Sequence, residues 1–167
     1  MRIFTLTLLL LSGVAHANET GQTLLAPFKQ ELKQALMAGL EQGPQAALTV
    51  CQQQAPEIAQ RHSVNGVLMG RSSDKLRNPN NQPPDWVAPI LKQFQSGDLS
   101  VVTVALDPQT QGYVEPIMIG PPCLTCHGEN IAPEIQQSLA EYYPSDQATG
   151  YQLGQWRGAF WVSYPTE

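Results

Sequence analysis

The stretch LSVVTVALDPQTQGYVEPIMIG, residues 99–120, sets the expected fold class. Its first half, LSVVTVALD, is rich in the β-branched residues that favour strands, and its end, YVEPIMIG, has the same character. The turn-forming residues PQTQG lie between them. The sequence therefore predicts two antiparallel strands joined as a hairpin.

The chain before this hairpin has a helical pattern followed by an extended one. Apolar residues recur at helical spacing from about Leu24 to Glu41, and Gly43 and Pro44 end this helix and open a second one over residues 44–62. Pro56 lies inside the second helix and is expected to kink it. The next segments predict a strand at 67–73 (VLMGRSS), a polar loop at 74–85 (DKLRNPNNQPPD) and a short helix at 86–95 (WVAPILKQFQ).

The chain after the hairpin predicts one more helix, IAPEIQQSLAEYY at 131–143, and two short final strands within YQLGQWRGAFWVSYP at 151–165. Gly and Pro interrupt the chain often, which disfavours a simple helix bundle. The predicted class is therefore α+β, with an antiparallel sheet, N-terminal helices and connecting helices packed over it.

The N-terminal residues MRIFTLTLLLLSGVAHA have the features of a secretory signal peptide. Arg2 precedes an apolar run from Leu6 to Leu11, and small residues surround the expected cut after Ala17. Residues 1–17 are thus predicted to be removed, which leaves one domain at 18–167, exported to the periplasm. No later segment has the roughly 20 apolar residues of a membrane-spanning helix, and no cysteine lies just after the expected cut to accept a lipid anchor.

The charge composition indicates which kinds of molecule are unfavourable partners for the protein. Arg2 is the only charged residue that the expected cut removes. Eight Lys and Arg therefore remain against 14 Asp and Glu, a formal net charge of −6. Nucleic acid is therefore an unfavourable partner. Exported proteins often pair their cysteines, but this chain has three, an odd number.

Two of those cysteines lie beside a histidine in GPPCLTCHGEN, residues 120–130. Cys123 and Cys126 are about one helical turn apart, the spacing that captures the two vinyl groups of haem as thioethers. His127 follows at once and can bind the iron. Bacteria attach haem in this way outside the cytoplasm, in agreement with the signal peptide. We therefore predict one covalent c-type haem, attached at Cys123 and Cys126, with His127 as its proximal ligand.

Two other chemistries could use a CxxC pair. A thioredoxin-like dithiol lies between a strand and a long helix of a βαβ unit, whereas Gly128 and Pro133 delay the next helix here and no βαβ pattern surrounds the pair. A thiol-disulfide oxidoreductase stays as a lesser alternative. Structural zinc needs four ligands, and the sequence has no second CxxC or His pair.

The residue types and their spacing do not identify the second axial ligand of the iron. Five side chains could occupy that position, and residue types alone favour Met or His over Cys, although each has an ordinary structural explanation. The candidates are Cys51, His62, Met37, Met69 and Met118.

Four stretches in order resemble a known family, the PAS-like single-haem c-type domains that occur as stand-alone periplasmic proteins and as extracytoplasmic sensor modules. They are VCQQQAPEIAQ, GRSSDKLRNPNNQPPDW, CLTCH and GQWRGAFWVS, and they span nearly the whole mature chain. The RSSDKLRNPNN part is distinctive, since CxxCH alone occurs in many unrelated cytochromes.

The resemblance implies that Cys51 is the second axial ligand of a six-coordinate, low-spin haem. A coordinated thiolate favours ferric iron, so the potential should lie below that of a His/Met cytochrome. Arg71 and Arg77 flank the loop of the distinctive stretch and are expected partners of the haem propionates; Arg77 could equally hold the loop in shape. Four aromatic residues are expected in the core and in the walls of the haem pocket: Trp86, Trp156, Phe160 and Trp161.

We expect a non-enzymatic function, because no hydrolytic motif is present and both faces of the iron are occupied. Electron transfer is favoured over a haem-based redox or gas sensor, since the chain has no output segment and would have to signal through a separate protein. The redox partner cannot be named; the acidic balance favours a basic docking face on it. A homodimer through the first helix is a further expectation.

Overall fold

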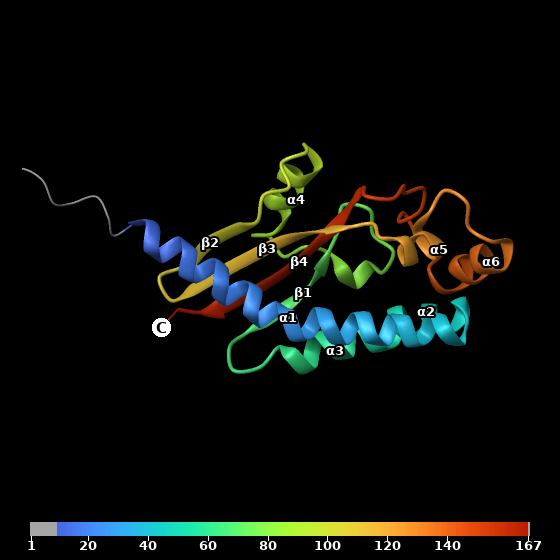
Figure 1. Cartoon of the computed structure of the whole chain (residues 1–167), viewed down its shortest axis with the longest axis horizontal. Coiled ribbons are helices and arrows are strands. Elements are labelled where there is room, and N and C mark those ends of the chain that lie inside the picture. The colour runs from blue at the N-terminus through green and yellow to red at the C-terminus, as the bar shows by residue number, and fades with distance from the viewer. Residues whose placement is uncertain (1–9, 167) are drawn as a thin grey trace, which may run out of the picture.

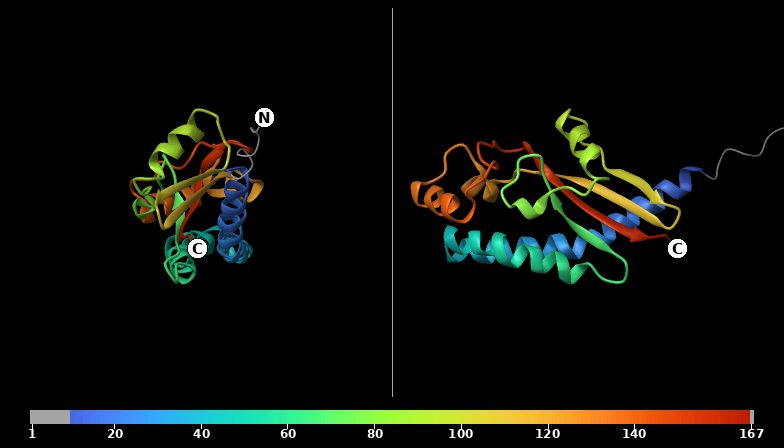
Figure 2. Two further views of the ribbon diagram at one scale, coloured as in Figure 1. Left: turned by 90° about the vertical axis from the view of Figure 1, so that its left-hand side faces the viewer. Right: turned by 180° about the vertical axis from the view of Figure 1, so that it is seen from behind.

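A computed structural model describes residues 10–166. In this part of the chain a four-stranded antiparallel sheet has the strand order β1-β4-β3-β2 and carries helices on both faces (Figures 1 and 2). The predicted hairpin is its β2–β3 edge. The predicted α+β class is confirmed. The strands are β1 Leu68–Ser72, β2 Val102–Asp107, β3 Thr110–Met118 and β4 Trp156–Pro165.

The N-terminal half forms a helical hairpin along one face of the sheet. The long helix α1 crosses the sheet obliquely, and the chain then returns beneath it (Figure 1). The turn between the two arms is at Gly43, which has a positive φ of 118° and precedes Pro44, the first residue of the returning arm. The segments are α1 Leu10–Gln42, α2 Pro44–Thr49, the π-helix η1 Val50–Gln54 and α3 Ala55–His62.

The returning arm is not one kinked α-helix, as the sequence predicts, but two α-helices joined by the π-helix η1. The reason lies at Pro56, which has no N–H to donate and therefore sits in the first turn of α3, where none is needed. Wider turns of this kind recur next to functional sites, and Cys51 is part of this one.

The core has two main parts, because successive strand residues point to opposite faces of the sheet. Tyr113 and Val162 pack on one face against α1 and α3. Val114 and Ala159 pack on the other face, against helix α4 (Ala88–Gln95). All four are at most 3% exposed, so the two central strands β3 and β4 are buried on both faces.

The remaining short elements gather at one end of the sheet, the end at which β3 finishes and β4 begins (Figure 1). Gly120 and two prolines lead from β3 directly into a 3-10 turn and the short helix that holds the cysteine motif. The elements are η2 Pro79–Asn81, η3 Pro121–Cys123, α5 Leu124–His127 and α6 Pro133–Tyr142.

Two further predictions need correction. Residues 151–165 hold one long strand, β4, rather than two short strands, because Trp156–Pro165 pairs with β1 and β3 together and is continuous in the middle of the sheet. The first helix begins at Leu10, earlier than its predicted start at Leu24. The predicted signal peptide lies partly outside the described residues, and cleavage after Ala17 stays a prediction.

Across residues 10–166, none of the helices combines the length and the hydropathy that crossing a membrane requires.

Candidate functional site

A cavity of about 470 Å³ lies between the helical hairpin and the end of the sheet that carries the cysteine motif. Such a volume is within the range of small-molecule and cofactor sites. Its walls are largely apolar, with contributions from α1, α2, the π-helix, β1, the ends of β3 and β4, and α5. The apolar lining includes Leu32, Leu36, Leu40, Ile117, Ile119 and Phe160.

The cysteine motif forms one wall of this cavity. Cys123 ends the 3-10 turn, Cys126 and His127 lie on α5, and all three line the cavity. Burial raises the pKa of the Cys126 thiol, so this thiol stays protonated at neutral pH. The predicted attachment residues and the predicted proximal ligand thus lie in one place.

His127 is oriented by a hydrogen bond to the backbone. Its Nδ1 lies 2.6 Å from the carbonyl oxygen of Ala148, which can only accept, so Nδ1 carries the proton and Nε2 keeps its lone pair. Burial, together with the positive charges of Arg77 and Arg157, lowers the pKa of His127 to about 3. The imidazole is therefore neutral at physiological pH, the form that binds a metal.

Arg77 stabilises the orientation of His127 through hydrogen bonds to the backbone around it. Its side chain is 7% exposed, and its Nη2 donates to the carbonyl oxygen of Cys126 at 2.5 Å and to that of Ala148 at 3.2 Å. Its Nε donates to Asp146 Oδ2 at 3.0 Å, and Asp146 Oδ1 accepts from the backbone N–H of Ala148 at 2.8 Å. Arg77 thus holds α5 and the carbonyl group that orients His127.

Cys51 faces the same cavity from the opposite, helical wall. It is near enough to influence the ionisation of Cys126 and of Arg71 electrostatically. Cys51, Cys123 and Cys126 are all free thiols.

The other candidate axial ligands separate into two groups. Met37 on α1 and Met118 at the end of β3 line the cavity, and they are 39% and 41% exposed. His62 lies outside the cavity, where its Nε2 contacts Glu31 Oε2 at 2.8 Å. Met69 is buried in the core between the sheet and α1. Geometry therefore removes His62 and Met69 as candidates.

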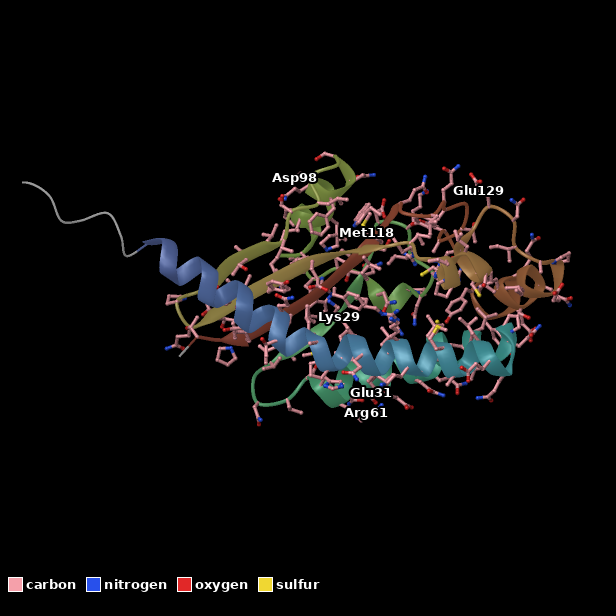
Figure 3. All side chains as sticks on the ribbon, viewed as in Figure 1. Lys29, Glu31, Arg61, Asp98, Met118 and Glu129 are labelled. Atoms are coloured by element: carbon pink, nitrogen blue, oxygen red, sulfur yellow. The ribbon has the colours of Figure 1, made fainter. Side chains whose placement is uncertain are left out.

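Figure 3 shows which charged side chains lie on each side of α1. Lys29 lies on the side of α1 towards the sheet and Met118 at the far end of β3, whereas Glu31 and Arg61 lie together on the outer side of the helical layer. The cavity side and the outer side of α1 therefore carry different charged groups.

Two guanidinium groups reach the cavity besides Arg77. Arg71, on β1, and Arg157, at the start of β4, both line it. Burial lowers the pKa of each, yet an arginine remains charged at neutral pH. The predicted site residue Arg71 thus lies in the cavity, and Arg77 reaches it while bonded to Asp146.

The aromatic residues named from the sequence divide between the two faces of the sheet. Phe160 lines the cavity. Trp86, Trp156 and Trp161 pack with α4 on the opposite face, so they are core residues and not cavity walls.

Sequence reasoning missed three residues of the site: Arg157, Asp146 and Ala148. The sequence could have indicated Arg157 as a site residue, because it lies in the GQWRGAFWVS stretch that carries part of the family resemblance. Asp146 and Ala148 lie in a connecting segment without a motif, and only the tertiary structure brings them to Arg77 and His127. Among the described residues, no group of three or more His, Cys, Asp or Glu side chains could hold a metal ion by itself.

Comparison with known proteins points to one family. Residues 12–165 match the model of the Tll0287-like family. Among solved structures, the chain is similar to the crystal structure of the cyanobacterial heme-protein Tll0287, at 26% sequence identity and a TM-score of 0.62. That similarity covers 86% of this chain and 93% of the other chain. No curated protein matches the sequence.

A match from residue 12 to residue 165 spans nearly all of the described chain, and the solved relative shares its fold over a similar range. The chain therefore belongs to the Tll0287-like family, which confirms the resemblance to PAS-like single-haem cytochrome domains.

Proposed function

We propose that this chain is a periplasmic c-type haem protein that transfers electrons. The haem is attached covalently at Cys123 and Cys126, with His127 and Cys51 as the two axial ligands. Haem supplies an iron that exchanges one electron with a partner. The name of the relative, a heme-protein, supports the cofactor.

The observation that carries the proposal is the state of His127. Its Nδ1 donates to Ala148 and its pKa is about 3, so a neutral imidazole keeps its Nε2 lone pair available for a metal. The same cavity holds a thiol on each side, Cys51 on the helical wall and the motif cysteines on the other. The donor set and the largely apolar lining fit haem.

The thiol-disulfide alternative has less support. Redox-active dithiols need a depressed thiol pKa, commonly at the N-terminus of a helix. Thioredoxin-like sites place the motif at the start of a long helix, whereas α5 is only four residues long and ends at His127. The motif therefore lacks the long helix of a thioredoxin-like site.

Covalent attachment is tested on chain produced together with the haem-attachment machinery of a bacterial periplasm. We expect intact mass to equal that of the chain without residues 1–17 plus one haem, and the haem to remain bound on a denaturing gel. The double variant Cys123→Ala/Cys126→Ala should lose the stain. A wild-type mass equal to the processed polypeptide alone would contradict the proposal.

Ligation by Cys51 is tested separately with Cys51→Ala. The ferric spectrum should change from low spin towards high spin, because the second axial donor is lost, while Met69→Leu, a buried control outside the cavity, should keep the low-spin spectrum. An unchanged spectrum in Cys51→Ala would mean that another side chain binds the iron, and Met37 and Met118 are then the residues to replace.

Sensing is the second candidate function. A thiolate ligand can dissociate once iron is reduced and the sulfur protonated, and Cys51 lies in a π-helix, a segment type that recurs at functional sites. Adding carbon monoxide to the reduced protein separates the two: rapid binding favours a sensor, and exclusion favours electron transfer.

A further inference from the structure

The cavity has a strong local charge that opposes the charge of the whole chain. Among the residues that the structure describes, five basic residues line it and no Asp or Glu does, although the formal net charge of the sequence is −5. The basic residues are Lys29, Lys33, Arg71, Arg77 and Arg157.

Two of these cations have carboxylate partners behind the cavity wall. Lys29 pairs with Glu115, and Arg77 pairs with Asp146. Lys33 is exposed and can be neutralised by solvent ions. Arg71 and Arg157 remain, and within residues 10–166 neither has an ion-pair partner. Two partly buried guanidinium groups without counter-charges are costly unless a ligand supplies the missing charge.

The contacts of the two guanidinium groups differ. Arg157 Nη1 donates to Ser73 Oγ at 2.7 Å and to the carbonyl oxygen of Lys75 at 3.2 Å, but its buried Nε–H has no acceptor among the described residues. Arg71 makes no hydrogen bond that would fix its guanidinium within the described chain. Both therefore keep donors that the protein leaves unused.

Strand geometry puts these donors side by side. Arg71 and Ser73 are two residues apart on and just after β1, so their side chains share a face of the strand. Arg157 reaches Ser73 from the neighbouring strand β4. The positive charge of Arg71 is also close enough to lower the pKa of Arg157.

We propose that Arg71 and Arg157 together form a subsite for two carboxylates of one ligand, and that Arg77 is a positioning residue for α5 and His127. On the proposed function this ligand is haem, whose two propionates supply two negative charges for the two guanidinium groups. This assignment replaces the pair Arg71 and Arg77 predicted from the sequence. Two of the three guanidinium groups thus bind the ligand, and the third, that of Arg77, holds α5 and the Ala148 carbonyl group in place.

The consequence for the iron is electrostatic. A positive charge beside the haem favours the ferrous state, which has one positive charge fewer. Removing either ligand-binding guanidinium should therefore lower the reduction potential and weaken the hydrogen bonding of a propionate. A purely structural role for Arg157 would affect stability without altering the propionate groups.

The experiment uses the haem-loaded full chain and the variants Arg71→Gln, Arg157→Gln and Arg157→Lys. The control Arg61→Gln removes the same charge from the outer side of the helical layer, where Arg61 pairs with Glu31. Each protein is measured for haem content by mass, for midpoint potential and for the propionate bending band in resonance Raman spectra.

We expect Arg71→Gln and Arg157→Gln to lower the potential and shift the propionate band, Arg157→Lys to restore part of the potential, and Arg61→Gln to match the wild type. Within residues 10–166 Arg71 has no side-chain hydrogen bond or ion pair to lose, so Arg71→Gln decides the result if Arg157→Gln does not fold. An unchanged band and potential in Arg71→Gln, with one haem per chain, would overturn this assignment alone. A wild-type chain without haem would overturn the proposed function, and the assignment with it.

Discussion

His127 can bind a metal only through the ring nitrogen that its protein partner leaves free. The carbonyl oxygen of Ala148 accepts a hydrogen bond from His127 Nδ1 at 2.6 Å, and the same oxygen accepts one from Arg77 Nη2. Asp146 completes the set by accepting from Arg77 and from the backbone N–H of Ala148. One buried ion pair therefore fixes the carbonyl group, and the carbonyl group fixes the imidazole.

We predict that Asp146→Ala lowers the free energy of unfolding by about 3–5 kcal/mol, because it leaves the buried Arg77 guanidinium without its partner. The Arg77 and Asp146 side chains are only 7% and 10% exposed. Urea unfolding followed by circular dichroism measures the change. The control Glu31→Ala breaks an exposed pair with Arg61 and should cost far less, since exposed ion pairs are weak. Equal losses in the two variants would contradict a structural role for the buried pair.

The pairing of β1 with β4 depends on a close approach at Gly158. A Cβ atom at this position would meet the carbonyl oxygen of Ser72 at 2.4 Å and the Cβ of Ser73 at 3.2 Å. Both obstacles belong to the segment that ends β1, and backbone cannot move aside as a side-chain tip can. Gly158 also follows Arg157, so the contact positions the guanidinium proposed to bind the ligand.

We therefore predict that Gly158→Ala destabilises the fold by about 1–3 kcal/mol, the usual cost of an overpacked site. The measurement is again the free energy of unfolding in urea. Gly120→Ala is the matched control, because a Cβ there would make only ordinary contacts, 3.8 Å to Pro122 and 4.0 Å to Cys123, and its φ of −97° suits any residue. A Gly158→Ala variant as stable as Gly120→Ala would show that β1 and β4 can separate at no cost.

Across the whole molecule, charge is divided unevenly. The chain is acidic overall, with a formal charge of −5, yet the walls of its cavity are basic. Met37 and Met118 line the cavity and are about two-fifths exposed, so the cavity reaches the surface between α1 and the end of β3. The local field there opposes the net charge, so this opening favours an acidic surface on a docking partner. The expectation of a basic docking face stays a prediction for the acidic remainder of the surface.

We predict that Lys33→Glu slows oxidation of the reduced haem protein by the anionic oxidant hexacyanoferrate(III) by about fivefold at low ionic strength. Lys33 is an exposed residue of the cavity lining. Lys92→Glu, on α4 across the sheet, changes the net charge equally and should have a smaller effect. Stopped-flow rates at low and high salt provide the comparison. Equal rates for both variants would mean that net charge, not the cavity opening, governs electron exchange.

The sequence by itself determined the local features of this protein. The β-branched residues and the turn residues within 99–120 predict the β2–β3 hairpin, and apolar spacing predicts the helix that ends near Gln42. The CxxCH spacing fixes the relation between Cys123, Cys126 and His127, because all three lie within one short turn of chain. Each of these depends on interactions between residues close together in sequence.

Tertiary structure alone decided which distant residues share the cavity. Cys51 and His127 are far apart in the sequence, and only the return of the helical hairpin beside α5 puts both on one cavity. Arg77 and Arg157 have the same side chain, yet Asp146 neutralises the first and no carboxylate in the described chain neutralises the second. Charge compensation and hydrogen-bond partners arise from packing between segments, so the roles of these arginines could not be assigned before the fold was known.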